Sequence, residues 1–416
     1  MHRLAKLDQR YVWHPFTQMR DWRRHEPVVL VRGKGAVLED VGGRKYLDAN
    51  ASIWTNLHGH NQPRVNAAIR RQLGMVAHTS ALGLANEPAS LLAERLVKLA
   101  GRPLAKVFYS DDGSTALEVA LKMAYEAARR EGMRRPRFLS LEGAYHGDTV
   151  GAVSLGHIDL FHKAYGGLLF KSDAVMAPYC YRCPFNRAKP GREDARAGRK
   201  CGWECVGKVE AKLKRRRYAG LVVEPLMQGA AGMIAQPEGW LSRVAALARE
   251  HGVRLIADEV MTGFGRTGPV FAVQREKVRP DFLCLAKGMT GGYLPMAATL
   301  TTREVFEAFL GKYEEFKTFF HGHSYTGNQL GAAAALASLE LLEESVKKRK
   351  LLEEWLREAL AGLWELEHVG DVRQTGLVAG VELVADWRRR EAYPLEQQAG
   401  IRVCEAMARR GVLTRP

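Results

Sequence analysis

The pattern of apolar positions divides the middle of the chain into alternating strands and helices. Short apolar runs predict strands over 106–110, 137–141, 221–224, 254–259, 282–286 and 296–301. Between them, apolar residues recur at helical spacing, as over 114–130 and 240–251. This alternation is typical of an α/β fold whose mostly parallel sheet is covered by helices on both faces. Ligands bind such sheets at the carboxyl ends of the strands.

After Gly327 the pattern becomes strongly helical over 328–346 and 350–366, and a short α+β segment follows. The last residues, GVLTRP, predict the start of a strand, so we expect a C-terminal truncation that lowers stability or activity relative to a longer chain. The predicted organisation has a large domain and a smaller α+β domain. Its parts are an N-terminal segment (1–60) that contributes to the small domain and pocket, the large α/β domain (61–327) with a Cys-rich insertion at about 178–206, and the C-terminal small domain (328–416).

Composition excludes disorder and a disulfide-rich scaffold. The 416 residues are 46% hydrophobic and 26% charged, and they include only 6 cysteines. No signal-peptide core opens the chain, and no window approaches ~18 apolar residues. We therefore expect a cytoplasmic protein with no membrane partner.

The net charge of +16 raises the question of a nucleic-acid partner. The basic runs are scattered, at 129–130, 214–217, 347–350 and 388–390, and no known binding module accompanies them. This distribution favours a solvated surface and no nucleic-acid partner. A non-enzymatic nucleic-acid-binding protein stays as an alternative, which a salt-dependent mobility shift would support.

Candidate chemistry lies at the ends of three predicted strands. Asp258 ends a buried strand, where an unpartnered carboxylate is costly. Lys287 ends the next strand, before glycines that allow close backbone approach. The stretch 112–115 (DGST) opens a helix directly after a strand, which makes an anion site. Together they indicate pyridoxal 5'-phosphate (PLP), with Lys for a Schiff base, Asp for the pyridinium nitrogen and the helix N-terminus for the phosphate.

These stretches also resemble the class III (ω-type) aminotransferases of fold type I, from about Tyr11 to Arg415. The resemblance is carried by DDGSTALEVALKMA, EGAYHGDTVGAVSLG, VVEPLMQGAAGM, ADEVMTGFGRTG, LAKGMTGGYLPMAA and HGHSYTGNQLGAAAALA. Within the family, WHPFTQM, SIWTNLHGHN and GVLTRP are similar to the group that converts 8-amino-7-oxononanoate to 7,8-diaminononanoate in biotin biosynthesis. The resemblance implies a PLP-dependent transaminase with ping-pong behaviour.

The resemblance also implies roles for individual residues. Lys287 forms the internal aldimine and moves the proton, Asp258 keeps the pyridinium protonated, and Tyr145 stacks on the ring. Gly113 and Ser114 bind the phosphate, and Ser324 completes that site from a partner subunit, which implies a homodimer. The residues implied to contact substrate are Phe16, Trp54, Tyr145, Gly322 and, for its carboxylate, Arg415. Glu224 and Arg266 are implied to support the site, and His146 is expected close to the cofactor.

Two positions depart from the relatives that use S-adenosylmethionine. Those relatives carry Trp-Trp where this chain has Ile53-Trp54, and HPYT where it has HPFT, so that Phe16 lacks a hydroxyl. The amino donor therefore stays open between S-adenosylmethionine and lysine. The alternative function is another class III ω-aminotransferase, acting on 4-aminobutyrate, ornithine or β-alanine, and WHPFTQM and LTRP argue against it.

Two further motifs need an interpretation. Cys180-x2-Cys183 and Cys201-x3-Cys205 have the spacing of a tetrahedral zinc site. Relatives often carry a segment similar to PYCYRCPF here without a metal role, so both interpretations stay open. GFGRTG (263–268) matches a dinucleotide-binding pattern, but no good helix follows it. We interpret it as an active-site loop.

Overall fold

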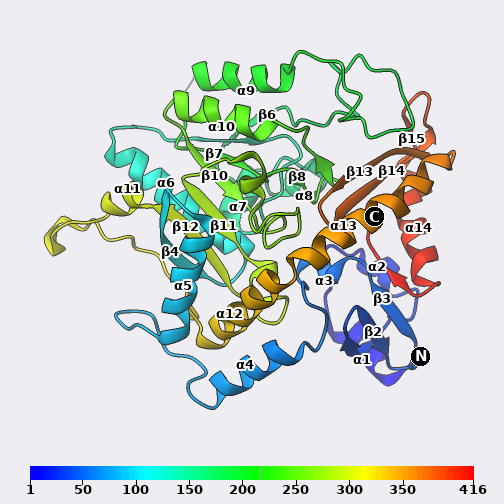
Figure 1. Ribbon diagram of the computed structural model, residues 1–416, viewed down its shortest axis with the longest axis horizontal. Coiled ribbons are helices and arrows are strands. Elements are labelled where there is room, and N and C mark those ends of the chain that lie inside the picture. The colour runs from blue at the N-terminus through cyan, green and yellow to red at the C-terminus, as the bar shows by residue number, and fades with distance from the viewer. Residues whose placement is uncertain (216) are drawn as a thin grey trace.

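The computed structural model describes residues 1–215 and 217–416, so that residue 216 of the basic run 214–217 lies outside the described residues. A seven-stranded sheet in the order β4-β12-β11-β10-β7-β5-β6 forms its centre (Figure 1). The strands are β4 (Leu104–Ser110), β5 (Phe138–Leu141), β6 (Asp173–Val175), β7 (Gly220–Val223), β10 (Arg254–Asp258), β11 (Phe282–Leu285) and β12 (Ala297–Thr302). All run parallel except β12, which is antiparallel to both neighbours. The prediction of a mostly parallel sheet is confirmed.

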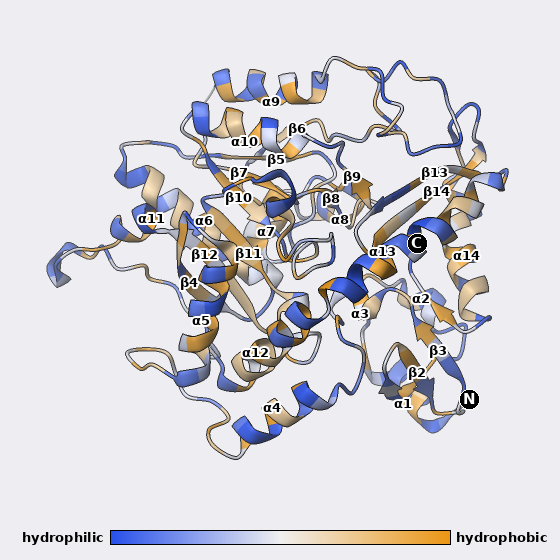
Figure 2. Cartoon of the chain, viewed as in Figure 1, coloured by the Kyte–Doolittle hydropathy of each residue, from blue (hydrophilic) through white to orange (hydrophobic). Residues whose placement is uncertain are grey.

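Helices cover both faces of this sheet. Along β10, Leu255 and Ala257 belong to one hydrophobic core, and Ile256 between them belongs to the other. The first core includes α5 (Glu87–Ala100), α9 (Glu204–Arg215), α10 (Trp240–Glu250) and α12 (Gln329–Glu344), and the second includes α6 (Gly113–Arg130), α7 (Val150–Leu155) and α11 (Arg303–Glu307). The central strands are therefore apolar on both faces, as their orange colour in Figure 2 shows, and appear in the sequence as continuous apolar runs.

Three smaller sheets complete the fold. One, of order β1-β2-β3-β16, joins the two ends of the chain, because β16 (Val412–Leu413) pairs in parallel with β3 (Lys45–Asp48). The predicted terminal strand is thus confirmed. The other strands are β1 (Leu30–Lys34), β2 (Val37–Asp40), β8 (Met227–Gln228), β9 (Ile234–Ala235), β13 (Val369–Thr375), β14 (Val378–Asp386) and β15 (Glu391–Ala392).

The remaining helices surround these sheets. They are α1 (Arg3–Tyr11), α2 (Met19–Trp22), α4 (Pro63–Leu73), α8 (Asp159–His162), α13 (Val346–Ala361) and α14 (Ala399–Ala408). Short 3₁₀ turns η1 to η6 lie at Lys163–Tyr165, Ala272–Glu276, Lys287–Thr290, Tyr313–Glu315, Gly362–Glu365 and Leu395–Gln397. In the described part of the chain, no helix has the length and apolar character needed to cross a membrane. The domain boundaries at 60 and 327 stay a prediction.

One short helix, α3 (Ala51–Trp54), has left-handed backbone geometry. Its four residues have φ values of 50°, 49°, 59° and 62°. None is glycine, and the left-handed conformation costs an L-residue roughly 1–2 kcal/mol. The Asp48 carboxylate offsets part of this cost by accepting hydrogen bonds from the Ser52 amide (2.9 Å) and hydroxyl (2.7 Å). The turn is a strained segment fixed by its surroundings.

Candidate active site

The candidate chemistry gathers at one edge of the central sheet. Each of five parallel strands, β4, β5, β7, β10 and β11, ends just before or at a candidate residue. In chain order these residues are Gly113 and Ser114, Tyr145 and His146, Glu224, Asp258, and Lys287. Because parallel strands place their carboxyl ends at one edge, residues far apart in the sequence come together there.

Lys287 follows β11 with a left-handed backbone, at a φ of 44°. Its Nζ lies 5.3 Å from the centre of the Trp54 ring, so α3 forms one wall around the amine. Burial lowers the pKa of Lys287, against the opposing attraction of Asp258 and Glu224. A lowered pKa increases the fraction of neutral amine, which is the form that acts as a nucleophile or base.

Asp258 is held by two donors at the end of β10. Its Oδ2 lies 2.7 Å from His146 Nδ1, and its Oδ1 accepts a hydrogen bond from the Val260 amide at 3.0 Å. Burial opposes the charged imidazolium, but the hydrogen bond and charge of Asp258 outweigh it and raise the pKa of His146. The result is a buried, oriented carboxylate.

The two other buried carboxylates have different surroundings. Glu224 accepts from the amides of Gly229 (2.8 Å) and Tyr145 (3.3 Å), and burial raises its pKa to about 7 against the lowering effect of the His146 charge. Glu259 accepts instead from the backbone amides of Ala272 and Val273, at 2.6 and 2.8 Å, and burial raises its pKa to about 8. Of the Asp258-Glu259 pair, only Asp258 bonds to His146, and Glu259 anchors the loop at η2.

The N-terminus of α6 forms a close-packed cradle beside Asp258. A Cβ atom on Gly113 would lie 2.4 Å from a methyl group of Val260, so only glycine allows α6 to begin this close to β10. A Cβ on Gly147 would lie 2.4 Å from Ser114, whose hydroxyl bonds to the Thr149 hydroxyl at 2.7 Å. The first amides of α6 have no partner within the helix and carry its positive dipole end. The cradle therefore suits an anionic group.

Aromatic side chains gather around Tyr145. The Tyr145 ring meets the edges of Phe16 and Phe161 at centroid distances of 6.3 and 6.2 Å, and it lies parallel to His162. Its hydroxyl donates to Asp148 at 2.6 Å. Burial raises the pKa of Tyr145, so its hydroxyl stays protonated. Sequence reasoning missed Phe161 and His162, because the short helix α8 has no pattern that points to a site.

Arg266, from the GFGRTG loop, supports the pocket wall. Its guanidinium donates to the carbonyl oxygens of Trp54 (3.0 Å) and Asn56 (3.3 Å), on either side of the end of α3. Burial lowers its pKa to about 10, although Asp48 opposes this. The loop leads into the 3₁₀ turn η2 and not into a long helix, which agrees with an active-site loop.

Three sequence candidates lie apart from this group. Gly322 and Ser324 are exposed, and the Ser324 carbonyl accepts a hydrogen bond from His78 at 2.8 Å. Arg415 is exposed just after β16. Within the described residues, no hydrogen bond or ion pair links these three to Lys287 or Asp258.

Comparisons with known proteins agree on one family. The family model for class III aminotransferases matches residues 19–416. The adenosylmethionine-8-amino-7-oxononanoate aminotransferase of Geobacter sulfurreducens is 51% identical, over 99% of this chain and 90% of that protein. The enzyme of the same description from Methanocaldococcus jannaschii has a crystal structure that matches with a TM-score of 0.92 and 42% identity, over 99% of this chain and 91% of that one. A PLP-bound amine transaminase from an uncultivated Pseudomonas species matches with a TM-score of 0.89 and 34% identity, over 98% and 91% of the two chains. This chain therefore belongs to the class III aminotransferase family.

Proposed function

We propose that this chain is the PLP-dependent aminotransferase that converts 8-amino-7-oxononanoate into 7,8-diaminononanoate in biotin biosynthesis. The observation that carries the chemistry is the meeting of Lys287, Asp258 and the α6 cradle at one sheet edge. The observation that favours this substrate is the identity of 51% to a relative that bears this enzyme's name.

The residues at the site fit PLP. Asp258, fixed by His146, would hold the pyridine nitrogen, and the glycine-lined cradle at Gly113 and Ser114 would hold the phosphate. Lys287 would bind the aldehyde carbon. When bound, the cofactor supplies an electron sink for the carbon whose C–H bond is broken.

The chain's own residues supply the proton transfer and the positioning. The Lys287 amine, with its lowered pKa, would take the proton from the carbon that bears the substrate amine and deliver it to the cofactor carbon that carried the aldehyde. Arg266 holds the backbone on either side of Trp54, and so keeps the Trp54 ring beside that amine. Phe16 and Phe161 beside Tyr145, and Trp54 beside Lys287, are apolar side chains that would suit the aliphatic chain of 8-amino-7-oxononanoate.

Spectroscopic titration of the PLP-loaded protein tests the function. We expect the visible absorbance of the bound cofactor to disappear with the amino donor and to return with 8-amino-7-oxononanoate. Loss of absorbance with S-adenosylmethionine supports that donor, and loss with lysine instead connects Ile53 and Phe16 with a changed donor. Loss only with 4-aminobutyrate, ornithine or β-alanine would contradict the proposed substrate.

Arg415 is proposed to bind the substrate carboxylate. Pairing of β16 with β3 carries the C-terminal end to the strand that precedes α3, and hence to the pocket wall. We expect Arg415→Ala to raise KM for 8-amino-7-oxononanoate roughly 10–100-fold, since a hydrogen bond to a charged group contributes about 1.5–3 kcal/mol. The value of kcat should change little, because such binding is equal in the ground and transition states. The control is Arg402→Ala, which removes an exposed arginine of α14, and steady-state kinetics compare the two variants. Equal KM values in both variants would refute a role of Arg415 in binding the carboxylate.

We also propose a homodimer in which Ser324 completes the phosphate site of the other subunit. Two exposed aromatic side chains lie close to Ser324 in the chain, Phe320 (68% exposed) and Tyr325 (61%), and Leu82 elsewhere is 91% exposed. Monomers rarely expose large apolar patches, so this surface suits a second copy. A monomeric mass for the PLP-loaded protein by light scattering would contradict the dimer.

A further inference from the structure

The four cysteines of the insertion surround one small cavity. Cys180 and Cys183 come from the segment after β6, Cys201 lies just before α9, and Cys205 lies in the first turn of α9. The cavity has a volume of about 10 Å³, and its other walls include Trp203. Roughly 10–15 Å³ is room for a single water-sized occupant. Folding has thus brought both cysteine pairs around a space for one small ligand.

The surroundings of the cavity favour a cation bound by sulfur. All four cysteines are free, and no histidine or carboxylate shares the lining. Arg199 also lines the cavity, stacks on Trp203 at 4.0 Å, and has a buried Nε without a hydrogen-bond partner. Four thiolates around a divalent cation carry a net charge of −2. The Arg199 guanidinium and the positive N-terminus of α9 are in place to balance it.

We propose that Cys180, Cys183, Cys201 and Cys205 bind one structural Zn²⁺ ion. Thiolate sulfur selects zinc or iron–sulfur clusters, and a space for one small occupant excludes a cluster. Four protein ligands leave no open coordination position, which is typical of a structural site. The cavity shares no lining residue with the candidate active site, so this inference goes beyond the proposed function.

Binding changes the protonation and the positions of these side chains. A cysteine binds a metal ion as the thiolate, so each thiol gives up its proton when the ion binds. Among the described residues, no group of three or more His, Cys, Asp or Glu side chains is already arranged to hold a metal ion. The ion therefore displaces the thiol protons to solvent and draws the four sulfurs inward.

The length of the insertion without regular secondary structure also favours a structural metal ion. Between β6, which ends at Val175, and α9, which begins at Glu204, the described chain has no helix or strand. Loops longer than about 12–15 residues without secondary structure are uncommon in compact domains, and a metal ion gives such a loop a core that it cannot build from apolar side chains.

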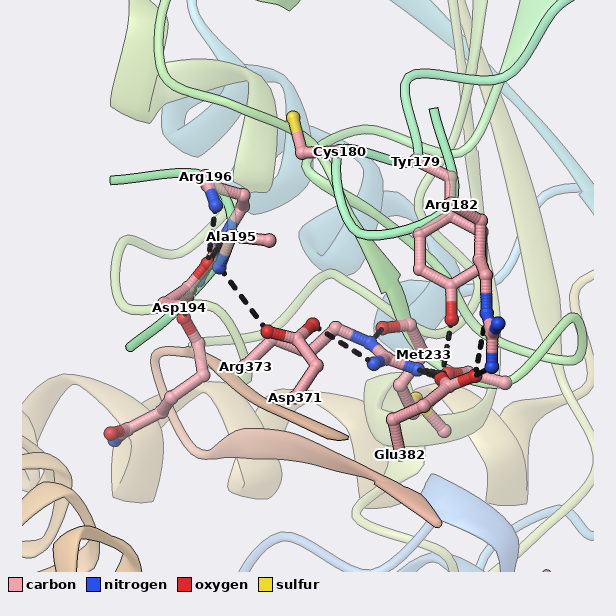
Figure 3. A network of polar contacts seen from close by, with 12 residues as sticks. Tyr179, Cys180, Arg182, Asp194, Ala195, Arg196, Met233, Asp371, Arg373 and Glu382 are labelled. Atoms are coloured by element: carbon pink, nitrogen blue, oxygen red, sulfur yellow. Dashed lines mark hydrogen bonds and ion pairs between the residues drawn. The ribbon is translucent and has the colours of Figure 1, made fainter. Parts of the chain in front are cut away.

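The same insertion holds the β13–β14 hairpin (Figure 3). Tyr179 and Arg182 bond to Glu382 of β14, the latter at 3.0 Å, and Arg196 donates to the carbonyl of Gln374 in β13 at 2.7 Å. Cys180 points away from this network, toward the other side of the loop (Figure 3). The ion would thus fix the side of the insertion that faces away from the β13–β14 hairpin, while the other side binds the hairpin.

Metal analysis of the purified protein, refolded or loaded with Zn²⁺ and then dialysed, tests the site. We expect one Zn²⁺ per chain, lost by at least about tenfold in the double variant Cys183→Ser/Cys201→Ser and kept in the matched control Cys404→Ser. Replacement by Co²⁺ should give the intense visible and near-ultraviolet bands of tetrahedral thiolate coordination. Neither readout depends on PLP or activity, so failure here is distinct from failure of the proposed function.

Three results would overturn the proposal. They are absence of bound Zn²⁺ in the loaded wild-type protein, retention of the full metal content by the double variant, and a disulfide between any two of the four cysteines in protein purified under reducing conditions. If the double variant does not fold, the release of Zn²⁺ from the wild-type protein tests the proposal instead. A mercurial titrant must free one Zn²⁺ as four thiols react, and chelation must speed proteolysis within 187–199.

Discussion

Replacing Lys287 by alanine is expected to lower turnover by at least about 10³-fold and to leave the fold intact. Positioned acid–base catalysis alone contributes roughly 10²–10⁴-fold, and the variant also loses the covalent attachment point. Stability should not fall. Burial lowers the pKa of Lys287, so the unfolded chain holds this proton more tightly than the folded one at neutral pH, and the buried amine is a net cost there.

Three measurements on Lys287→Ala check this. Turnover should be lost, the melting temperature should be equal or higher, and PLP should no longer stay attached to the protein after borohydride treatment and denaturation. Lys347→Ala, which removes an exposed lysine of α13, is the control and should behave as the wild type. Turnover within tenfold of the wild type, or covalent retention of PLP at another residue, would show that Lys287 is not the reactive lysine.

Asp258→Asn is expected to have the next largest effect, on the order of a 10²–10³-fold loss in kcat, comparable with removal of one preorganised electrostatic partner. The amide preserves the shape and can still accept from the Val260 amide, but it lacks the charge that stabilises a protonated pyridine ring. The same charge raises the pKa of His146. The pKa of His146 should therefore fall in the variant.

Loss of the charge lowers the pKa of His146 whatever the role of Asp258, so the His146 titration only checks that the pair is broken. The role is decided by kcat, because a purely structural role would lower the melting temperature and leave the kcat of the folded enzyme unchanged. The matched control is Asp281→Asn, a half-buried carboxylate, which accepts from the Leu255 amide at 2.8 Å and lies at the opposite end of β10. It should lose stability but keep kcat, and an equal loss of kcat in both variants would refute the assignment.

The sequence predicted six of the seven strands of the central sheet, because the inner strands are buried on both faces, and it missed the short edge strand β6. Such strands appear in the sequence as short apolar runs. The polar candidate residues of the site follow these runs, because they lie at the carboxyl ends of the strands. The direction of β12 was not predictable, because an apolar run of this kind carries no direction. The N-terminal sheet was missed for another reason, since most residues of β1 are exposed and have no apolar pattern.

Contacts within the site were harder to foresee than the residues themselves. His146 and Asp258 are 112 positions apart, and neither neighbourhood indicates that they form a buried pair. The left-handed backbone of α3 was equally hidden, because no glycine occurs in 51–54 to announce it. The contacts that hold it come from Asp48, four residues before Ser52, and from Arg266 in a distant part of the chain.

The handedness of α3 restricts how the pocket can be redesigned. Ile53 has a φ of 59°, where a β-branched side chain is strongly disfavoured, so the shape of this side chain is kept against the preference of its own backbone. Substitutions at residue 53 must therefore first be compatible with this backbone conformation, before the fit of the new side chain to its surroundings matters. Asparagine, aspartate and glycine adopt this backbone conformation with little conformational strain, whereas valine and threonine have the same strain as isoleucine. Side-chain shape and stability are therefore coupled at residue 53.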